Sequence, residues 1–337
     1  MSRGWRAWVA GGAAAGLLLL GDASRAFAYL KFGFAAGGQV VTLKWSAMPV
    51  RYYVTDAGTP EVSSASLRAA VGRAFSTWQA TGTAAVTYEF AGFTAALPSE
   101  DDGRSTLGFM ARPDLDRVLA ATSFLVDAAT GELLESDIFF NTAATWSTAA
   151  AGEPGRFDLE TIALHEVGHL SGLGHSALGE TQLAAGGRQV VATASIMFPL
   201  AFGRGSVANR TPHADDLAGL SDIYPASRFR SETGSISGRV TKNGTGVFGA
   251  HVTALHLETG ALVGGFSLNA RGEFVLAGLL PGAHVVRVEP LDDAELDSFF
   301  DDTTAVDVGF RAAFHPRLAV VPRGGDSGAI DLKVASR

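Results

Sequence analysis

The pattern of apolar and polar positions predicts three helices in the first two thirds of the chain. Apolar residues recur at helical spacing along Ser63–Gln79, which predicts an amphipathic helix there. A second helix is expected over Phe157–Ser171, because Asp158 is a suitable N-cap and apolar residues follow at intervals of three and four. The dipeptide Thr211-Pro212 is suited to begin a third helix that runs to about Tyr224.

Short runs of strand-forming residues lie between these helices, and a second set follows Pro225. The first set is expected at Met48–Thr55, Val86–Phe90, Val118–Val126 and Ser136–Asn141. Strands mixed with few helices are typical of an α+β fold. The second set has glycine-rich turns and no helix, which predicts a β-sandwich. Its strands are expected at Ser235–Val240, Gly249–Leu257, Gly272–Leu276, His284–Glu289 and Ala329–Val334.

The first 28 residues have the layout of a secretory signal peptide. Arg3 and Arg6 precede the apolar run Ala7–Leu20, and small residues stand at the expected cleavage position after Ala28. An uncleaved membrane anchor is the alternative, but the run is shorter than a membrane span and glycine interrupts it. The protein is therefore expected outside the cytoplasm: secreted, periplasmic or at the cell surface. The chain is expected to divide into a signal peptide (1–28), a flexible leader (29–40), a first domain (41–225), a linker (226–233) and a β-sandwich (234–337).

Composition narrows the function further. With 337 residues, the chain is long enough for two domains. Its net charge of −8 argues against a nucleic-acid partner, which requires a basic surface. The absence of cysteine excludes disulfides, thiolate metal sites and a cysteine nucleophile. Beyond the leader, no stretch is apolar over the length that a membrane span needs.

The candidate chemistry is concentrated in the segment HEVGHLSGLGH, residues 165–175. His165 and His169 share a helix face, so both imidazoles can bind one ion, while Glu166 can reach a water on that ion. Gly172 allows the helix to end and the chain to turn, which brings His175 back as a third ligand. Three imidazoles leave a fourth zinc position open, as catalytic sites do. Histidines buried in an ordinary helix are the alternative, but they would not explain this spacing.

Gly168 supports the same interpretation. Glycine within a helix costs about 1 kcal/mol relative to alanine. We therefore expect another part of the protein to approach the helix backbone closely at Gly168.

These residues carry a resemblance to the metzincin zinc peptidases. The segment through Ser176 resembles the matrixin (matrix metalloproteinase-like) form of their zinc signature. Other segments are similar to the matrixin opening strand and first helix, last sheet strands, Met-turn and C-terminal helix. They are Lys44-Trp45, Leu67–Trp78, Ser136–Asn141 with Trp146, Ser195–Pro199 and His213–Tyr224. The resemblance covers about residues 41–225 and implies a twisted mixed sheet with three helices.

The resemblance implies a secreted zinc metalloendopeptidase. One zinc ion would be held by His165, His169 and His175, and Glu166 would act as general base on a zinc-bound water. Met197 would lie beneath the ligands as structural support. A protein or peptide substrate would pair with the edge strand around Leu119 to Ser123. Residues 198–200 would form one wall of the pocket beside this strand. The implied substrate contacts are Leu119, Ala120, Ala121 and Thr122 on the strand, and Phe198, Pro199 and Leu200 on the wall; for the wall, core packing is an equal alternative.

The chain departs from the matrixin pattern in several respects. No histidine precedes His165, so the second, structural zinc site of animal matrixins is not expected, and without cysteine a cysteine switch is impossible. The stretch between His175 and Met197 is longer than the pattern, so the subsite preference is not carried over. Calcium is common in the family, but Asp127, Glu132 and Asp137 are equally explained as solvated turn charges.

The last domain resembles a carboxypeptidase-regulatory-like module, a prealbumin-like or immunoglobulin-like sandwich without catalytic residues. The similar segments are Gly234–Val240, Gly249–Ala254, Asn269–Phe274 and Gly278–Gly282. Its histidines, among them His251, are not spaced for a metal, and Asp292–Asp302 is expected as a solvated acidic loop. The domain could serve stability, attachment to a surface or protein ligand, or substrate capture.

Two other functions remain open. The protein could be a non-catalytic adhesion or binding protein built on a metzincin domain, although an intact Glu166 argues against lost turnover. It could also be a self-processing enzyme that acts on its own leader or on one partner.

Overall fold

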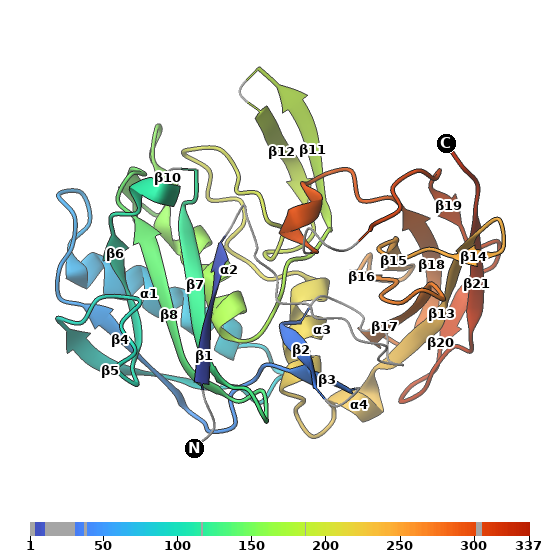
Figure 1. The fold of residues 1–337 in the computed structure, drawn as a ribbon, viewed down its shortest axis with the longest axis horizontal. Coiled ribbons are helices and arrows are strands. Elements are labelled where there is room, and N and C mark those ends of the chain that lie inside the picture. Colours follow the sequence, from blue (N-terminus) through green and yellow to red (C-terminus); the bar gives the residue numbers. More distant parts are fainter. Residues whose placement is uncertain (1–3, 11–30, 37–38, 116, 186, 301–304) are drawn as a thin grey trace.

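Two units lie side by side along the long axis of the computed structural model (Figure 1). The first combines a sheet with helices, and the second is almost entirely strands. The structure describes residues 4–10, 31–36, 39–115, 117–185, 187–300 and 305–337. Within these ranges, no helix has the length and apolar character that crossing a membrane requires.

A six-stranded mixed sheet forms the base of the first unit. In spatial order its strands are β1 (Gly4–Ala10), β7 (Ala120–Asp127), β8 (Leu133–Asn141), β6 (Ser105–Met110), β4 (Val50–Thr55) and β5 (Tyr88–Thr94). The last four run parallel to one another, whereas β7 is antiparallel to β8, and β1 to β7. β4, β5, β7 and β8 overlap the expected strands. β6 was not predicted from the sequence, because most of its side chains are buried and it lacks polar alternation.

Helices pack against this sheet as the apolar patterns predict. α1 contacts β4 and β5, α2 contacts β7 and β8, and the two helices contact each other. The Trp78 indole donates a hydrogen bond to the carbonyl of Leu164 at 2.8 Å, which joins the two helices. The helices of this unit are α1 (Ser64–Gln79), α2 (Leu159–Leu170), α3 (Ala214–Ile223) and the short 3-10 turn η1 (Pro113–Leu115), and a parallel bridge joins β9 (Trp146–Ser147) to β10 (Phe157–Asp158).

Two of the three helix starts agree with the sequence. Ser63 caps α1, and the Asp158 carboxylate caps α2 by accepting the Thr161 N–H at 2.9 Å. The prediction for the start of α3 was wrong by two residues, since its N-cap is His213 rather than Thr211. The carboxylate of Asp216 accepts the His213 N–H at 2.7 Å, and this acidic first-turn residue fixes the start.

The described part of the expected leader is not a free segment, which corrects that expectation. β2 (Gly33–Ala36) and β3 (Gln39–Thr42) form an antiparallel hairpin. Phe32 precedes it and donates its backbone N–H to the carbonyl of Gly172 at 3.0 Å. The backbone pairing and this bond hold the segment against the end of α2. Ala28, the expected cleavage position, lies outside the described residues, and part of the expected signal peptide forms β1.

The second unit is a β-sandwich, as the spacing of its strands predicts. One sheet contains β14-β13-β17 with β21 beside β13, and the other contains β16-β15-β18 with β19 and β20 beside β18. Side chains from both sheets meet in one apolar core, including Ile236, Leu276, Val252, Val286 and Phe310. The strands are β13 (Gly234–Lys242), β14 (Thr245–Gly246), β15 (His251–His256), β16 (Leu262–Phe266), β17 (Glu273–Leu279), β18 (Gly282–Glu289), β19 (Ala313–Phe314), β20 (Ala319–Val321) and β21 (Ile330–Val334).

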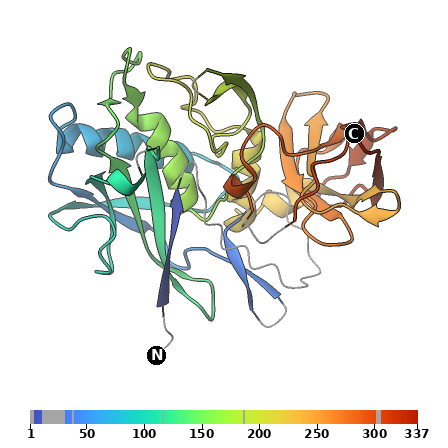
Figure 2. The same cartoon turned by 45° about the horizontal axis from the view of Figure 1, so that its top comes forward.

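The linker and one loop of the second unit have defined structure where the two units meet. The expected linker contains α4 (Phe229–Glu232), whose Phe229 is buried. The described part of the expected solvated loop, residues 292–300, contains the 3-10 turn η2 (Leu296–Ser298) and two buried phenylalanines, while Asp292 and Asp297 are exposed as expected. Both corrections have the same physical cause, which is burial of aromatic side chains between the units. In Figures 1 and 2 the η2 turn lies between the two units.

A hairpin projects from the first unit between His175 and the Met197 segment (Figures 1 and 2). Its strands β11 (Gly179–Ala184) and β12 (Gly187–Thr193) are antiparallel. The sequence shows extra length here, but these strands were not predicted. Leu183 is 79% exposed, so most of the hairpin has no core to bury, and an apolar alternation is absent.

Candidate metal centre

Helix α2 and the turn after it bring three histidines together. His165 and His169 lie one helical turn apart on α2, with Glu166 between them. Gly172 follows with φ +96°, a conformation that favours glycine, and a Cβ there would lie 2.6 Å from the Leu43 carbonyl oxygen. The turn that the sequence predicts at Gly172 is therefore confirmed, and it returns the chain so that His175 faces the helix.

Each imidazole is oriented by a backbone carbonyl. The three Nδ1 atoms of His165, His169 and His175 are hydrogen-bonded to the carbonyl oxygens of Ile196, Leu173 and Ser298, at 2.8, 2.8 and 2.6 Å, respectively. A carbonyl only accepts hydrogen bonds, so Nδ1 carries the proton in each ring. In the neutral imidazoles, Nε2 is then a free lone pair, the form that binds a metal ion.

The three Nε2 atoms fit a metal ion. One ligand atom from each histidine lies within 4.8 Å of the other two, and the Nε2 atoms of His169 and His175 are 3.2 Å apart. Two lone pairs at this distance repel unless a cation lies between them. The Nε2 of His165 is also buried without a hydrogen-bond partner. Within the described ranges, no other group of three His, Cys, Asp or Glu side chains is arranged for a metal ion.

Burial keeps the three rings neutral. Desolvation lowers the pKa of His165 to about 4 and that of His175 to about 3, and it lowers the pKa of His169 as well. The neighbouring rings lower the pKa of His169 and His175 further. At neutral pH the histidines are therefore ready to bind a cation without first losing a proton.

Glu166 is buried beside the ligands and contacts β7, the strand expected at the sheet edge; in the structure β1 pairs with its outer side, so β7 is not the edge. The Thr122 hydroxyl donates a hydrogen bond of 2.6 Å to its Oε2. Desolvation raises the pKa of Glu166 to about 8, and the hydrogen bond from Thr122 opposes this rise. A bound divalent cation would favour the carboxylate form. Thr122 was expected among the substrate contacts, but its contact with Glu166 was not predicted.

The segment around Met197 lies directly beneath α2. A Cβ on Gly168 would lie 2.3 Å from the Met197 sulfur and 3.0 Å from a ring carbon of Trp78. The close approach that the sequence predicts at Gly168 is therefore confirmed. Asp216 holds the same segment from α3, because its carboxylate accepts hydrogen bonds from the Ser195 hydroxyl and the Ile196 N–H.

Gly168→Ala is expected to destabilise the protein, whereas Gly72→Ala on α1 is expected to stabilise it. The added methyl at Gly168 must displace Met197 or Trp78, so the free energy of unfolding should fall by about 1–3 kcal/mol. A Cβ at Gly72 would meet only the Tyr52 hydroxyl, at 3.8 Å, so the helix preference for alanine should raise the free energy of unfolding by about 0.5–1 kcal/mol. Urea unfolding measures both. Equal stability of the two variants would contradict the close packing at Gly168.

The expected substrate contacts lie in two places. Ala120, Ala121 and Thr122 are on β7, immediately after Leu119, and Thr122 faces Glu166. On the expected pocket wall, Phe198 is buried among apolar side chains of the second unit, so core packing describes its position. Pro199 is buried and Leu200 is partly exposed.

The carboxylates considered for calcium have other partners. Asp137 is fully buried and accepts the N–H groups of Ser99 and Thr106 at 2.6 and 2.8 Å. Asp127 accepts the N–H of Ala129 within a turn. These bonds satisfy Asp137 and Asp127 locally, and the structure gives no evidence for calcium. The interpretation of Asp137 as a solvated charge was also wrong, because its role is to hold a loop over the sheet.

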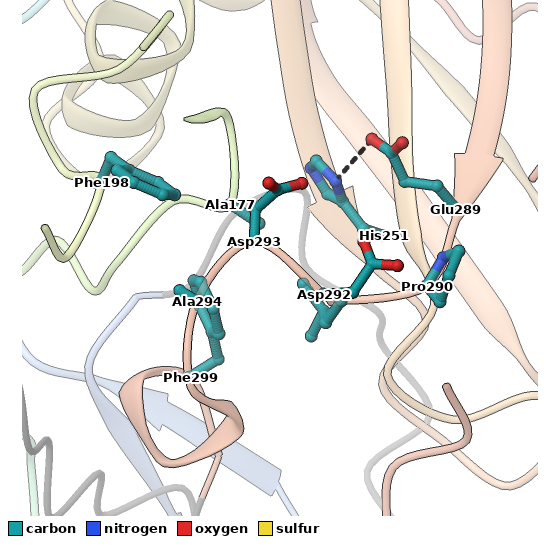
Figure 3. A pocket seen from close by; sticks show the side chains of 10 residues that line it. Ala177, Phe198, His251, Glu289, Pro290, Asp292, Asp293, Ala294 and Phe299 are labelled. Atoms are coloured by element: carbon teal, nitrogen blue, oxygen red, sulfur yellow. Dashed lines mark ion pairs between the residues drawn. The ribbon is translucent and has the colours of Figure 1, made fainter. Parts of the chain in front are cut away.

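A pocket between the two units lies beside the loop that carries His175. Ala177 and Phe198 line it from the first unit, and His251 pairs there with Glu289 at 3.3 Å (Figure 3). No sequence motif predicts that these side chains meet. The pocket shows that the second unit contacts the first close to the metal ligands.

Comparisons with known proteins identify the first unit more closely than the second. The family model described as Matrixin matches residues 44–225. No curated protein matches the chain. Among solved structures, the chain is similar to the dioxygenase domain of a dioxygenase carbohydrate-binding protein fusion from the cellulolytic bacterium Streptomyces sp. SirexAA-E. The identity is 17%, the match covers 33% of this chain and 85% of that chain, and the TM-score is 0.19, which is too low to support any inference about fold or activity.

Proposed function

This chain belongs to the Matrixin family, and we propose that it is an exported zinc-dependent endopeptidase. Membership of this family supports the assignment of the first unit as a zinc metallopeptidase domain that acts on proteins or peptides. The observation that carries the proposal is the convergence of three neutral imidazoles beside a buried carboxylate. His165, His169 and His175 would hold one zinc ion, and Glu166 would be the general base.

The proposed chemistry divides between the ion and the side chains. Zinc with three protein ligands has an open position, where it activates water and polarises a carbonyl. Glu166 accepts the proton of the attacking water and then donates it to the leaving amine. Thr122 holds the Glu166 carboxylate in place through its hydroxyl. Met197 supports the base of the site through its contact with α2 at Gly168.

We propose that the substrate binds as an extra strand on β7. The outer edge of β7 accepts an antiparallel strand, since Gly4–Ala10 pairs with it along its length. In this register Val9 lies opposite Thr122, the residue that contacts Glu166. Cleavage of a signal peptide after Ala28 would remove β1 and leave the edge free. Strand addition gives affinity through backbone hydrogen bonds.

The proposed function is tested with the secreted protein and an unfolded protein as substrate. We expect about one zinc ion per chain, cleavage of the substrate, loss of cleavage with a zinc chelator and its recovery with added zinc. A chain that retains no zinc would overturn the proposal. A chain that retains zinc but cleaves neither the substrate nor its own leader would favour a non-catalytic binding protein.

A further inference from the structure

The third histidine differs from the other two in the origin of its partner. His165 and His169 are oriented by carbonyl groups of the first unit, Ile196 and Leu173. His175 is oriented by Ser298, which lies 123 residues later, in the η2 turn of the second unit. The Nδ1–O distance of 2.6 Å is the shortest of the three. The two units therefore share the construction of one site.

Aromatic packing holds the Ser298 carbonyl in position. Phe299 is 3% exposed, and its ring centroid lies 5.7 Å from that of Phe266 and 6.5 Å from that of His175. The same apolar cluster contains Phe198, which follows Met197 in the chain. Within the turn, Ser298 donates its N–H to the carbonyl of Glu295 at 3.0 Å. The turn is thus fixed both by its own hydrogen bond and by its contact with the first unit.

Two further contacts connect the second unit with the chain that follows His175. The Asp215 carboxylate accepts hydrogen bonds from the Ser176 hydroxyl at 2.6 Å and from the Gly264 N–H of β16 at 2.8 Å. Asp293 accepts the Thr181 N–H of β11 at 2.9 Å. The chain that follows His175 is therefore tied to the second unit at two points, at Ser176 through Asp215 and at Thr181 directly.

We propose that the C-terminal sandwich is a structural part of the metal centre, and that the Ser298 carbonyl is a positioning group for His175. This inference rests on the proposed role of His175 as a zinc ligand. A hydrogen bond at Nδ1 fixes the tautomer and the orientation of a histidine ligand, and its loss typically weakens metal affinity about 10–100-fold. The sandwich therefore contributes to zinc affinity without touching the ion.

The experiment compares two phenylalanine truncations in the full chain. Phe299→Ala removes the side chain that holds the η2 turn beside His175 by apolar packing. Phe310→Ala removes another buried ring, from the apolar core of the same sandwich. That core contains none of the residues that contact His175. The zinc dissociation constant is measured by chelator competition, and the coordination geometry is followed by the visible spectrum of the cobalt-substituted protein.

Phe299→Ala is expected to raise the zinc dissociation constant about 10–100-fold and to change the cobalt spectrum. Phe310→Ala should leave both nearly unchanged, although each variant lowers the melting temperature. If Phe299→Ala fails to fold, Phe299→Leu is measured instead, and a smaller shift in the same direction is expected.

The result separates this inference from the proposed function. If the unmodified chain binds zinc tightly and Phe299→Ala binds it equally well, the positioning role is overturned and the zinc site stands. Equal weakening in both variants would also overturn it, because general destabilisation would then be the cause. If the unmodified chain binds no zinc, the proposed function itself fails.

Discussion

Glu166→Gln is expected to lower kcat/KM for peptide cleavage by about two to four orders of magnitude while zinc content and fold are kept. Glutamine has nearly the same shape as glutamate and can still accept the hydrogen bond from Thr122. It cannot accept a proton from water at neutral pH, so the general-base step is lost. The side chain is buried, so a neutral replacement leaves no uncompensated charge in the site.

The control is Glu160→Gln on the same helix. Glu160 pairs with Arg73 at 2.6 Å near the start of α2, away from the histidines. We expect this variant to keep its cleavage rate within about twofold, because the ion-pair partners of Glu160 are Arg73 and Arg210, which are not site residues. Zinc analysis and the melting temperature accompany the rate measurement. Unchanged cleavage by Glu166→Gln, with zinc bound, would rule out Glu166 as the base.

Asp215 is expected to make the stability of the protein depend on pH. Its carboxyl group is 3% exposed, and burial together with the neighbouring charge of Asp216 raises its pKa from 3.8 to about 7. Between these values the folded chain holds a proton that the unfolded chain releases. The resulting stability is fully present below about pH 4 and is lost as the pH rises through 7. Each pKa unit corresponds to about 1.4 kcal/mol, so the full loss is about 4 kcal/mol.

Asp215→Asn removes this dependence. Asparagine can accept the Gly264 N–H and donate to the Ser176 hydroxyl, but it does not ionise. The free energy of unfolding of the variant, relative to the unmodified chain, should therefore increase between pH 4 and pH 8. Urea unfolding across this range measures the difference, with the exposed residue Asp331 replaced by asparagine as the control. A constant difference across the range would show that Asp215 does not titrate there.

Local sequence signals predicted the parts of the site that one segment builds. The spacing of His165, Glu166 and His169 requires only a helix, and Asp158 caps that helix as expected. Gly168 indicated a close approach, because glycine within a helix is costly and is expected where another group needs the space. Gly172 indicated a turn, because glycine adopts a positive φ without steric strain.

The parts that depend on distant contacts could not be predicted in the same way. Ser298 acts through its backbone carbonyl, so its side chain carries no signal of the role. Phe299 is one of two adjacent phenylalanines in an acidic stretch, and its burial depends on the second unit packing against the first. The hairpin β11–β12 was missed because backbone pairing, rather than an apolar face, holds its strands together. β6 was missed for the opposite reason, since burial on both faces removes the alternation.

The separation of 123 residues between His175 and Ser298 has a consequence for the synthesis of the protein. Translation starts at the N-terminus, so His165, His169 and His175 are synthesised well before Ser298. The carbonyl that orients His175 is therefore the last of these groups to be made. During that interval the nascent chain has the ligands but lacks the final contact of the site. We expect full zinc retention to arise only after translation has passed Ser298.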